Sequence, residues 1–532
     1  MRNKQFIYIL LLVLTLASCA KRGSITGGDK DITPPVMISS TPKNFSKEFN
    51  KNQVKIYFDE YVKIKDIDKN LIISPPMKTA PTITPQGSAS KYISIIINDT
   101  LKPNTTYSFN FGQSIIDNNE GNAYKNFKYV VSTGKEIDSL TLEGTIKDAY
   151  EKDIPHFVNV MLYEVDDNFK DSIIYKETPR YITNTLDSVN TFKIENIKAG
   201  KYKLIALKEK SPNYKFNPKT EKIGFYDKVI SIPDKSIYEL ELFKEKLPTK
   251  FKRPSQASGN RVVIGYEGSI DNVKASVTFK NSLLNTKLTQ LQGKDSLQLW
   301  FKPIKNDSID LSLENGEVKN KFWVKLRNQR NDTLKLSLKS DKTLHLKENL
   351  GVTLSTPLEK IDLTKIKLIR KDSSKVEFKT NYDEFNQKLD LIFEKQPEEK
   401  YAIELLPGAI EDYLGQKNDT LKSVFTTKAL VDYGNLTLNL KNGKKSPIIV
   451  ELTDEKGNVE YIQFADQPKT IEFLLLEPKK YFLRVIYDLN NNKKWDTGSY
   501  LESRQPEEVF HFPTEIIIRP NWDVNQDVDL GK

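Results

Sequence analysis

The chain has 532 residues, of which 38% are hydrophobic and 29% are charged. This length is too great for one hydrophobic core, and the polar composition excludes a protein built mainly of membrane spans or of disordered sequence. Lys and Arg number 81 against 71 Asp and Glu, and the net charge of +10 is scattered along the chain. A nucleic-acid-binding stripe is therefore not indicated.

The first 18 residues have the layout of a secretion signal. Arg2 and Lys4 precede an apolar run over residues 6–16, which at about 11 residues is too short to span a bilayer. The only cysteine, Cys19, ends the stretch "LASC", which resembles the lipobox of bacterial lipoproteins. That resemblance implies cleavage before Cys19 and a lipid on its side chain; the alternative is an ordinary signal peptide with an incidental cysteine. Removing residues 1–18 takes away two charges, 10 − 2 = +8.

Residues 19–32 form a Gly- and Ser-containing tether that is followed by two prolines. In Gram-negative groups that export lipoproteins to the cell surface, the export tag resembles a short acidic run just after the cysteine. Here Lys21 and Arg22 occupy that place. The sequence therefore predicts a lipid-anchored protein of the outer membrane that faces the periplasm, and the cell surface is the less favoured alternative.

Apolar residues alternate with polar ones through most of the remaining chain. In "TYSFNFGQ", Tyr107, Phe109 and Phe111 share one face, and in "KYISIIIND" the same holds for Ile93 and Ile95. Such runs, separated by Asn, Gly, Pro and Asp, are typical of β-sandwiches. We expect an all-β protein made of tandem sandwich modules.

The chain contains an internal repeat in two parts. "PNTTYSFNFGQSIIDNNEGN" from Pro103 aligns without a gap with "PEEKYAIELLPGAIEDYLGQ" from Pro397, and "KYKLIALKEKSPNYKFN" from Lys201 aligns with "KYFLRVIYDLNNNKKWD" from Lys480. The Pro-containing, basic stretch Lys244–Asn260 is predicted to be a linker. The predicted modules are A at 33–136, B at 137–247, C at 259–340, A′ at 341–429 and B′ at 430–532.

Two of these modules resemble known families. Module A resembles the S-layer-type bacterial Ig-like domain through "PPVMISSTPKN", "VKIYFDEYV", "IIDNNEGN" and "VVSTG", and A′ does so more weakly. Module B resembles the transthyretin-like, carboxypeptidase-regulatory type of sandwich through "LEGTIKDAY" and "FKIENIKAGKYKLIAL", and B′ repeats the pattern. Both resemblances imply β-sandwiches with accessory or adhesive roles and no catalysis.

Module B′ contains a loop, "DLNNNKKWD", that begins as calcium-binding loops do. Short oxygen side chains stand at positions 1, 3, 5 and 9, and position 7 would contribute a backbone carbonyl. The usual glycine at position 6 and glutamate at position 12 are missing, so Glu502 or Glu507 would have to complete the site. The candidate calcium ligands are Asp488, Asn490, Asn492, Lys494 and Asp496.

The repeat offers an alternative to metal binding. The equivalent positions in B are Glu209, Ser211, Asn213 and Asn217, with one carboxylate instead of two. A loop whose shape persists while its charge changes is typical of a tight turn, in which Asx side chains accept nearby backbone amides. Under either interpretation the role of the loop is structural.

No arrangement of catalytic residues is apparent. His156, His345 and His511 lie in different modules without HExxH spacing, and there is no P-loop or nucleophile elbow. The SxxK stretches at Ser40–Lys43 and Ser88–Lys91 lie in turn-like sequence containing Pro or Gly, where one helical turn is not expected. The sequence favours a protein that is not an enzyme.

Two non-enzymatic functions remain. The first is a periplasm-facing scaffold or adaptor, which binds another envelope protein in a machine for outer-membrane assembly or secretion. The second is a glycan-binding or adhesive lipoprotein that uses exposed aromatic side chains; Trp495 is the weakest candidate, because it aligns with the apolar Phe216. The other candidates are Trp300, Trp323 and Trp522. No cofactor other than calcium is expected.

Overall fold

The computed structural model describes residues 30–531, except 186–188, 305–306 and 339–341. The predicted signal peptide and Cys19 lie outside these residues. Within them the chain is built almost entirely of strands, which confirms the all-β prediction. No helix in the described part of the chain is long and apolar enough to cross a membrane.

Module A is a sandwich whose strands are β1 (Met37–Thr41), β2 (Gln53–Ile64), β3 (Ile72–Ser74), β4 (Thr82–Thr84), β5 (Ser90–Ile96), β6 (Thr106–Asn110), β7 (Ile115–Asp117) and β8 (Lys128–Ser132), with a short helix α2 (Ile67–Asn70). One sheet has the order β1-β2-β5-β4 with β7 beside β2, and the other has the order β3-β6-β8. The predicted alternation is confirmed, because Tyr107, Phe109 and Phe111 are buried in the core.

Module A′ repeats this design with β26 (Leu336–Leu338), β27 (Leu350–Leu354), β28 (Leu358–Ile361), β29 (Ile366–Arg370), β30 (Lys379–Asp383), β31 (Lys388–Ile392), β32 (Lys400–Leu405), β33 (Ile410–Asp412) and β34 (Leu421–Thr426), and a 3-10 turn η2 (Leu363–Lys365). The order β26-β27-β31-β30 matches β1-β2-β5-β4, and β29-β32-β34 matches β3-β6-β8. The single strand β2 of A corresponds to two strands, β27 and β28, because Pro357 interrupts the ladder.

Module B consists of β9 (Leu140–Asp148), β10 (Asn159–Glu164), β11 (Tyr181–Asn184), β12 (Thr191–Ile197), β13 (Gly200–Lys208), β14 (Lys222–Phe225), β15 (Ile230–Ile232) and β16 (Ile237–Leu242), with a 3-10 turn η1 (Asp171–Tyr175). One sheet has the order β11-β10-β13-β14 with β15 beside β13, and the other has the order β12-β9-β16. Strands β9 and β16 are parallel, which places the end of the module next to its start.

Module B′ has the same topology in β35 (Gly434–Lys441), β36 (Ile448–Thr453), β37 (Val459–Ala465), β38 (Thr470–Leu476), β39 (Lys480–Tyr487), β40 (Val509–His511), β41 (Ile516–Ile517) and β42 (Asp523–Asp529), after a 3-10 turn η3 (Leu430–Asp432). Its sheets are β37-β36-β39-β40 and β38-β35-β42, with β35 and β42 parallel. A tyrosine corner also repeats: the Tyr202 hydroxyl donates to the Lys198 carbonyl at 2.8 Å, and the Tyr481 hydroxyl donates to the Glu477 carbonyl at 2.9 Å.

Module C is a sandwich of β17 (Lys250–Phe251), β18 (Ser255–Ser258), β19 (Arg261–Glu267), β20 (Lys274–Phe279), β21 (Ser282–Leu283), β22 (Lys287–Gln290), β23 (Ser296–Trp300), β24 (Ser308–Asn315) and β25 (Val318–Lys325). The predicted linker at 244–260 is therefore wrong in part, because β17 and β18 both pair with β19. Pro254 between them suits an edge position, where a missing N–H breaks no ladder bond. Strand β26 pairs within A′, although it lies in the range assigned to C.

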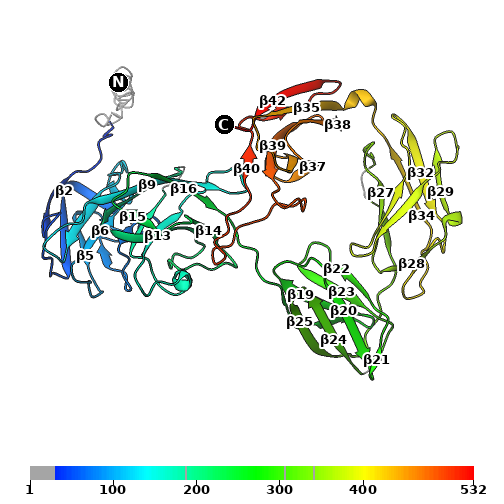
Figure 1. Ribbon diagram of the computed structural model, residues 1–532, viewed down its shortest axis with the longest axis horizontal. Helices are drawn as coiled ribbons and strands as arrows, with labels where there is room; N and C mark the ends of the chain where they lie inside the picture. The colour runs from blue at the N-terminus through cyan, green and yellow to red at the C-terminus, as the bar shows by residue number, and fades with distance from the viewer. Residues whose placement is uncertain (1–29, 186–188, 305–306, 339–341, 532) are drawn as a thin grey trace, which may run out of the picture.

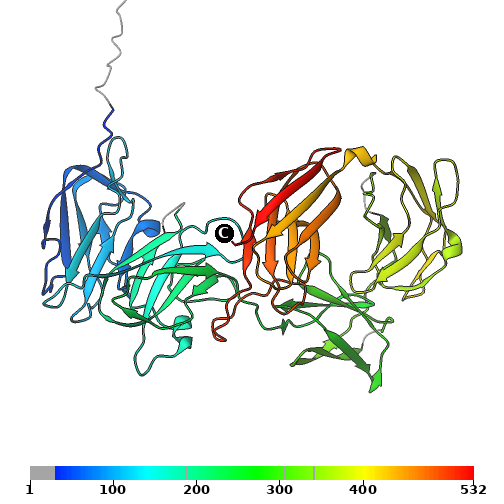
Figure 2. The ribbon, with the colours of Figure 1, turned by 45° about the horizontal axis from the view of Figure 1, so that its top comes forward.

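The modules are arranged so that the end of the chain returns to its first half. Modules B, C, A′ and B′ follow one another around a closed circle, and module A packs on the outside of B (Figures 1 and 2). Polar contacts bridge each junction: Lys219 with Glu267 at 3.0 Å between B and C, the Gln290 amide with the Phe385 carbonyl at 2.7 Å between C and A′, and Lys428 with Glu477 at 2.9 Å between A′ and B′. The last junction, between B′ and B, contains the candidate site.

Candidate functional site

The loop predicted to bind calcium follows strand β39 and is held by its own hydrogen bonds. Asp488 is buried, and its carboxylate accepts the backbone N–H groups of Asn492 at 3.0 Å and of Lys493 at 2.8 Å. The side-chain amides of Asn490 and Asn492 both donate to one carboxylate oxygen of Asp496, at 2.6 and 2.7 Å. These bonds are those of an Asx-stabilised turn.

Glu507, one of the two glutamates that the sequence offered to complete the site, folds back and closes this loop. Its carboxylate accepts the N–H of Leu489 at 2.7 Å and the N–H of Asp496 at 2.9 Å. Burial raises the pKa of Glu507. Glu502, the other candidate, is exposed on the surface and lies 3.2 Å from the Nε atom of Arg504.

The same turn is present in module B. Glu209 accepts the N–H groups of Asn213 at 3.2 Å and of Tyr214 at 2.6 Å, and Glu221 accepts the N–H of Asn217 at 2.8 Å. These bonds match those made by the two buried acids of the B′ loop. The turn therefore forms in both modules, although module B lacks the second short carboxylate of the B′ loop.

The oxygens expected to bind calcium are thus already acceptors of N–H groups. Lys494, expected to contribute its carbonyl, donates its own N–H to the side chain of Asn492 at 2.8 Å. Among the described residues, no group of three or more His, Cys, Asp and Glu side chains is placed to hold a metal ion. In the described loop these side chains bond to one another and to backbone N–H groups, and calcium binding stays a prediction.

The two repeats differ in the length of chain beyond the turn. Residues 218–220 connect the turn to its closing glutamate in B, whereas residues 497–506 do so in B′. The longer connection, which we call the docking segment, reaches across to module B (Figure 2). It approaches closely at Gly498, where an added Cβ would lie 2.6 Å from the ring of Phe243. Only glycine fits at this point.

Tyr500 is the centre of the docking segment. It is 2% exposed and belongs to a hydrophobic core cluster made otherwise of residues from module B. Its ring meets the ring of Phe225 edge-on, its backbone N–H donates to Glu245 at 2.6 Å, and its hydroxyl donates to Asp171 at 3.3 Å. Burial raises the pKa of Glu245. Burying a side chain of this size contributes roughly 2 kcal/mol.

A second cluster of the seam between B and B′ is centred on Arg484 of β39. Its Nε atom lies 2.6 Å from Glu451, and both side chains are buried. Its Nη2 donates to the Tyr150 hydroxyl of module B at 2.8 Å, and its guanidinium carbon lies 3.9 Å from the centre of that ring. Trp495 contacts the Tyr150 ring with centroids 4.6 Å apart. Polar and aromatic contacts therefore fix the orientation of B′ on B.

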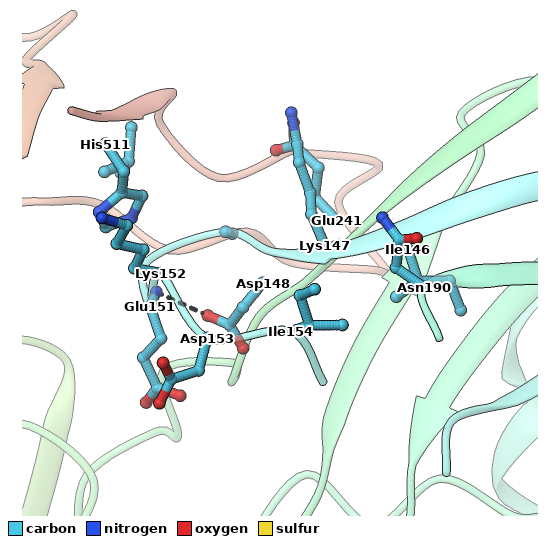
Figure 3. Close-up of a pocket in the computed structure, with 12 residues that line it drawn as sticks. Ile146, Lys147, Asp148, Glu151, Lys152, Asp153, Ile154, Asn190, Glu241 and His511 are labelled. Atoms are coloured by element: carbon cyan, nitrogen blue, oxygen red, sulfur yellow. Dashed lines mark hydrogen bonds and ion pairs between the residues drawn. The ribbon is translucent and has the colours of Figure 1, made fainter. Parts of the chain in front are cut away.

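His511 of β40 lines a pocket of about 140 Å³ at the same seam (Figure 3). Burial, together with the charges of Arg484 and Lys152, lowers the pKa of His511 to about 4. Across the pocket Asp148 accepts the N–H of Glu151 at 2.9 Å. The described residues that line the pocket include lysines and carboxylates but no Ser, Thr or Cys.

The three histidines noted in the sequence lie at two different junctions between modules. His156 and His511 line one groove of about 970 Å³ between B and B′, although the sequence placed them in unrelated positions. His345 lies apart, at the junction of A′ and B′, with its Nε2 atom 2.8 Å from the Leu475 carbonyl. The histidines thus lie at module junctions, which their spacing in the sequence does not reveal.

The four tryptophans do not form one binding surface. Trp300 is fully buried and donates to Thr289 at 2.9 Å. Trp495 is half-buried and packs against module B, not inside its own module. Trp323 and Trp522 are 58% and 54% exposed, in modules C and B′.

The family comparison supports the fold of the first module. The family described as "Bacterial Ig-like domain" matches residues 31–133. This match confirms the bacterial Ig-like resemblance of module A and covers about one fifth of the chain. No curated protein matches the chain.

Solved structures of tandem modules align with the chain at low similarity. "Structure of surface layer protein SbsC, domains 1-6" aligns at 10% identity over 91% of this chain and 67% of that chain, with a TM-score of 0.16. "I-band fragment I67-I69 from titin" aligns at 10% identity over 53% of this chain and 100% of that chain, with a TM-score of 0.13. Such TM-scores do not establish a shared arrangement of modules.

Proposed function

We propose that this protein is a non-catalytic, lipid-anchored scaffold or adaptor of the outer membrane, which faces the periplasm and binds another envelope protein of an assembly or secretion machine. The proposal rests on an all-β chain of repeated sandwiches and on the match of module A to the bacterial Ig-like domain, a resemblance that implies a non-catalytic module.

The observation that carries the proposal is the docking of Tyr500 into the core of module B. Tandem sandwiches joined only by linkers change their relative orientation freely, and interfaces between them are usually small. Here a buried side chain joins the last module to the second. A platform of fixed shape can present several surfaces to a partner at once, which is what an adaptor requires.

The anchoring part of the proposal concerns residues before the described region. Cys19 would carry the lipid, and the basic Lys21 and Arg22 favour retention on the periplasmic face. Protease treatment of intact cells tests the orientation. We expect the protein to resist digestion until the outer membrane is opened, and digestion of intact cells would contradict a periplasmic orientation.

The adaptor role is tested by cross-linking and co-purification. The protein would carry a C-terminal tag, cells would be cross-linked, and the outer membrane would be solubilised before purification. We expect a stoichiometric outer-membrane barrel protein or secretion component to co-purify. Recovery of the protein alone, or with polysaccharide only, would contradict the adaptor role.

A second candidate function, glycan binding, is favoured by one surface of module A. Tyr57 and Tyr92 are cross-strand partners with ring centroids 5.8 Å apart, and Tyr61, four residues further along β2, is also exposed. The equivalent positions of the first pair in A′ are Thr353 and Lys388, so the aromatic face is not required by the fold. Flat exposed rings suit sugar stacking.

Affinity electrophoresis in gels that contain peptidoglycan fragments or acidic polysaccharide tests this second function. Glycan binding predicts retardation of the wild-type protein and its loss in Tyr57→Ala/Tyr92→Ala. Equal mobility in all gels would remove glycan binding as a function of this surface.

A further inference from the structure

One sandwich edge is covered in the first repeat and open in the second. In module B, strands β11 and β12 lie against module A, where the N–H of Ile182 donates to the Ser74 hydroxyl at 3.1 Å. Ile182 is 3% exposed, whereas Ile462, which stands at the equivalent place on β37, is 43% exposed. Module A therefore covers an edge of B that remains open in B′.

The open edge of B′ is apolar. Phe464, two residues further along β37, is exposed as Ile462 is. Phe464 stands where module B has Asn184, so an exposed phenylalanine occupies a position where a polar residue is compatible with the fold. Exposed apolar side chains clustered at one sheet edge indicate a contact surface.

The residues that join A to B are changed in the second repeat. In the first, Lys128 pairs with Glu195, and Arg180 donates to Thr105 at 3.2 Å. In the second, the positions of Arg180 and Thr105 are taken by Glu460 and Glu399. Two acids, neither of which can donate a hydrogen bond when ionised, replace the hydrogen-bonded pair, so this contact between A and B has no counterpart between A′ and B′.

The edge is also free to pair through its backbone. β37 is the end strand of its sheet, and no strand among the described residues pairs with its outer side. Its seven residues contain neither Lys nor Pro, which commonly protect such edges. The end strand β25 of module C, by contrast, carries Lys319, Lys321 and Lys325.

We propose that β37, with its exposed Ile462 and Phe464, receives an extended segment of a partner protein by strand addition. The segment would pair its backbone with the outer side of β37 and place apolar side chains, two residues apart, over the exposed apolar group. The unpaired backbone groups of β37 select a polypeptide over a lipid or a sugar, because a polypeptide supplies a matching row of N–H and C=O groups. This proposal rests on the adaptor function and identifies the surface that such an adaptor uses.

A designed peptide tests strand addition without knowledge of the partner. The probe is fluorescein-labelled acetyl-Lys-Thr-Val-Thr-Val-Thr-Val-Lys-amide, and its binding to the chain without residues 1–19 is measured by fluorescence anisotropy. We expect saturable binding below about 1 mM, as for a short strand without optimised side chains. Ile462→Asp/Phe464→Asp should weaken binding at least about tenfold.

Two controls make the test specific. Ile517→Asp changes an exposed apolar residue of the same module away from this edge and should leave the affinity unchanged. The same peptide with N-methylated valines keeps its side chains but loses backbone donors, and it should not bind. No saturable binding of the unmodified peptide, or binding that survives Ile462→Asp/Phe464→Asp, would overturn the proposal.

The failure of this proposal can be distinguished from failure of the adaptor function. A partner that co-purifies equally with wild type and with Ile462→Asp/Phe464→Asp would keep the adaptor function and place its surface elsewhere. Loss of the partner from this variant but not from Ile517→Asp would link the two proposals.

Discussion

The ring of Tyr500 meets the ring of Phe225 edge-on, with centroids 5.2 Å apart and planes at 81°, although the two residues are separated by more than half of the length of the chain. Edge-to-face packing of this kind adds specificity to the burial of apolar area. The contact makes the docking segment of B′ part of the core of B.

Removing this contact should destabilise the seam. Tyr500→Ala is expected to lower the free energy of unfolding by about 3 kcal/mol, because a large buried ring leaves a cavity. Urea titration followed by tryptophan fluorescence measures the effect, since Trp495 lies at the seam. Tyr61→Ala, at an exposed tyrosine, is the control and should cost less than about 0.5 kcal/mol. Equal effects of the two changes would contradict the account.

The buried ion pair between Glu451 and Arg484 occupies positions that are apolar in the first repeat. There the equivalent residues are Met161 and Ile205. Glu451→Ala alone should cost about 3–5 kcal/mol, because it leaves the arginine charge buried without its carboxylate. The double change Glu451→Met/Arg484→Ile should cost less than the single one, as measured by the same urea titration. A larger loss in the double variant would contradict this assignment.

His511 should make stability depend on pH. Its pKa is about 4 in the folded protein and 6.5 ordinarily, so between these values the unfolded chain binds more protons and stability falls as the pH is lowered. The contribution is on the order of 1–2 kcal/mol, after allowance for partial exposure. His511→Gln should flatten the pH dependence of the melting temperature between pH 6.5 and 4.

The comparison with His511→Gln is needed because other titratable groups change the stability in the opposite direction as the pH is lowered. Burial raises the pKa values of Glu245 and Glu507, so their contribution favours the folded state at low pH and is lost as the pH rises. Only the difference between wild type and variant isolates the histidine. Identical pH profiles for the two proteins would contradict a buried, neutral His511.

The Asp488 loop gives a direct test of the calcium prediction. The hydrogen bonds of the turn predict that the full chain melts at the same temperature in calcium and in chelator. Asp488→Ala should lower stability by about 1–3 kcal/mol in both conditions, since it removes a buried acceptor of two N–H groups. A rise in melting temperature with calcium that Asp488→Ala abolishes would establish a metal site and contradict the turn assignment.

Sequence patterns were sufficient to predict those parts of the fold in which the same local chemistry repeats. The alternation of apolar residues predicted the strands, and Tyr202 and Tyr481 aligned without a gap because each forms the same corner of the same topology. The alignment fails by one residue near Asp117. Its structural counterpart is Asp412, since both are buried and accept turn amides, whereas the ungapped match would pair Asp117 with Glu411.

The seam could not be predicted in the same way. Tyr500 lies in a polar stretch with no periodicity, and its burial depends on a partner surface far away in the chain. The signal that was present is the greater length of residues 497–506 relative to 218–220, which an ungapped alignment ending at Asp496 does not reach. Likewise Ile462 and Ile182 are the same residue type, and only the packing of module A separates the buried one from the exposed one.

The central claim is that B′ docks on B in one orientation and closes the circle of modules. Electron paramagnetic resonance between spin labels on cysteines introduced at the exposed Ile237 of B and Ile517 of B′, with Cys19 changed to Ser, measures this most directly. The account predicts one narrow distance distribution, which broadens when Tyr500→Asp is added. A broad distribution in the protein that retains Tyr500 would show that the two modules move independently and would contradict the claim.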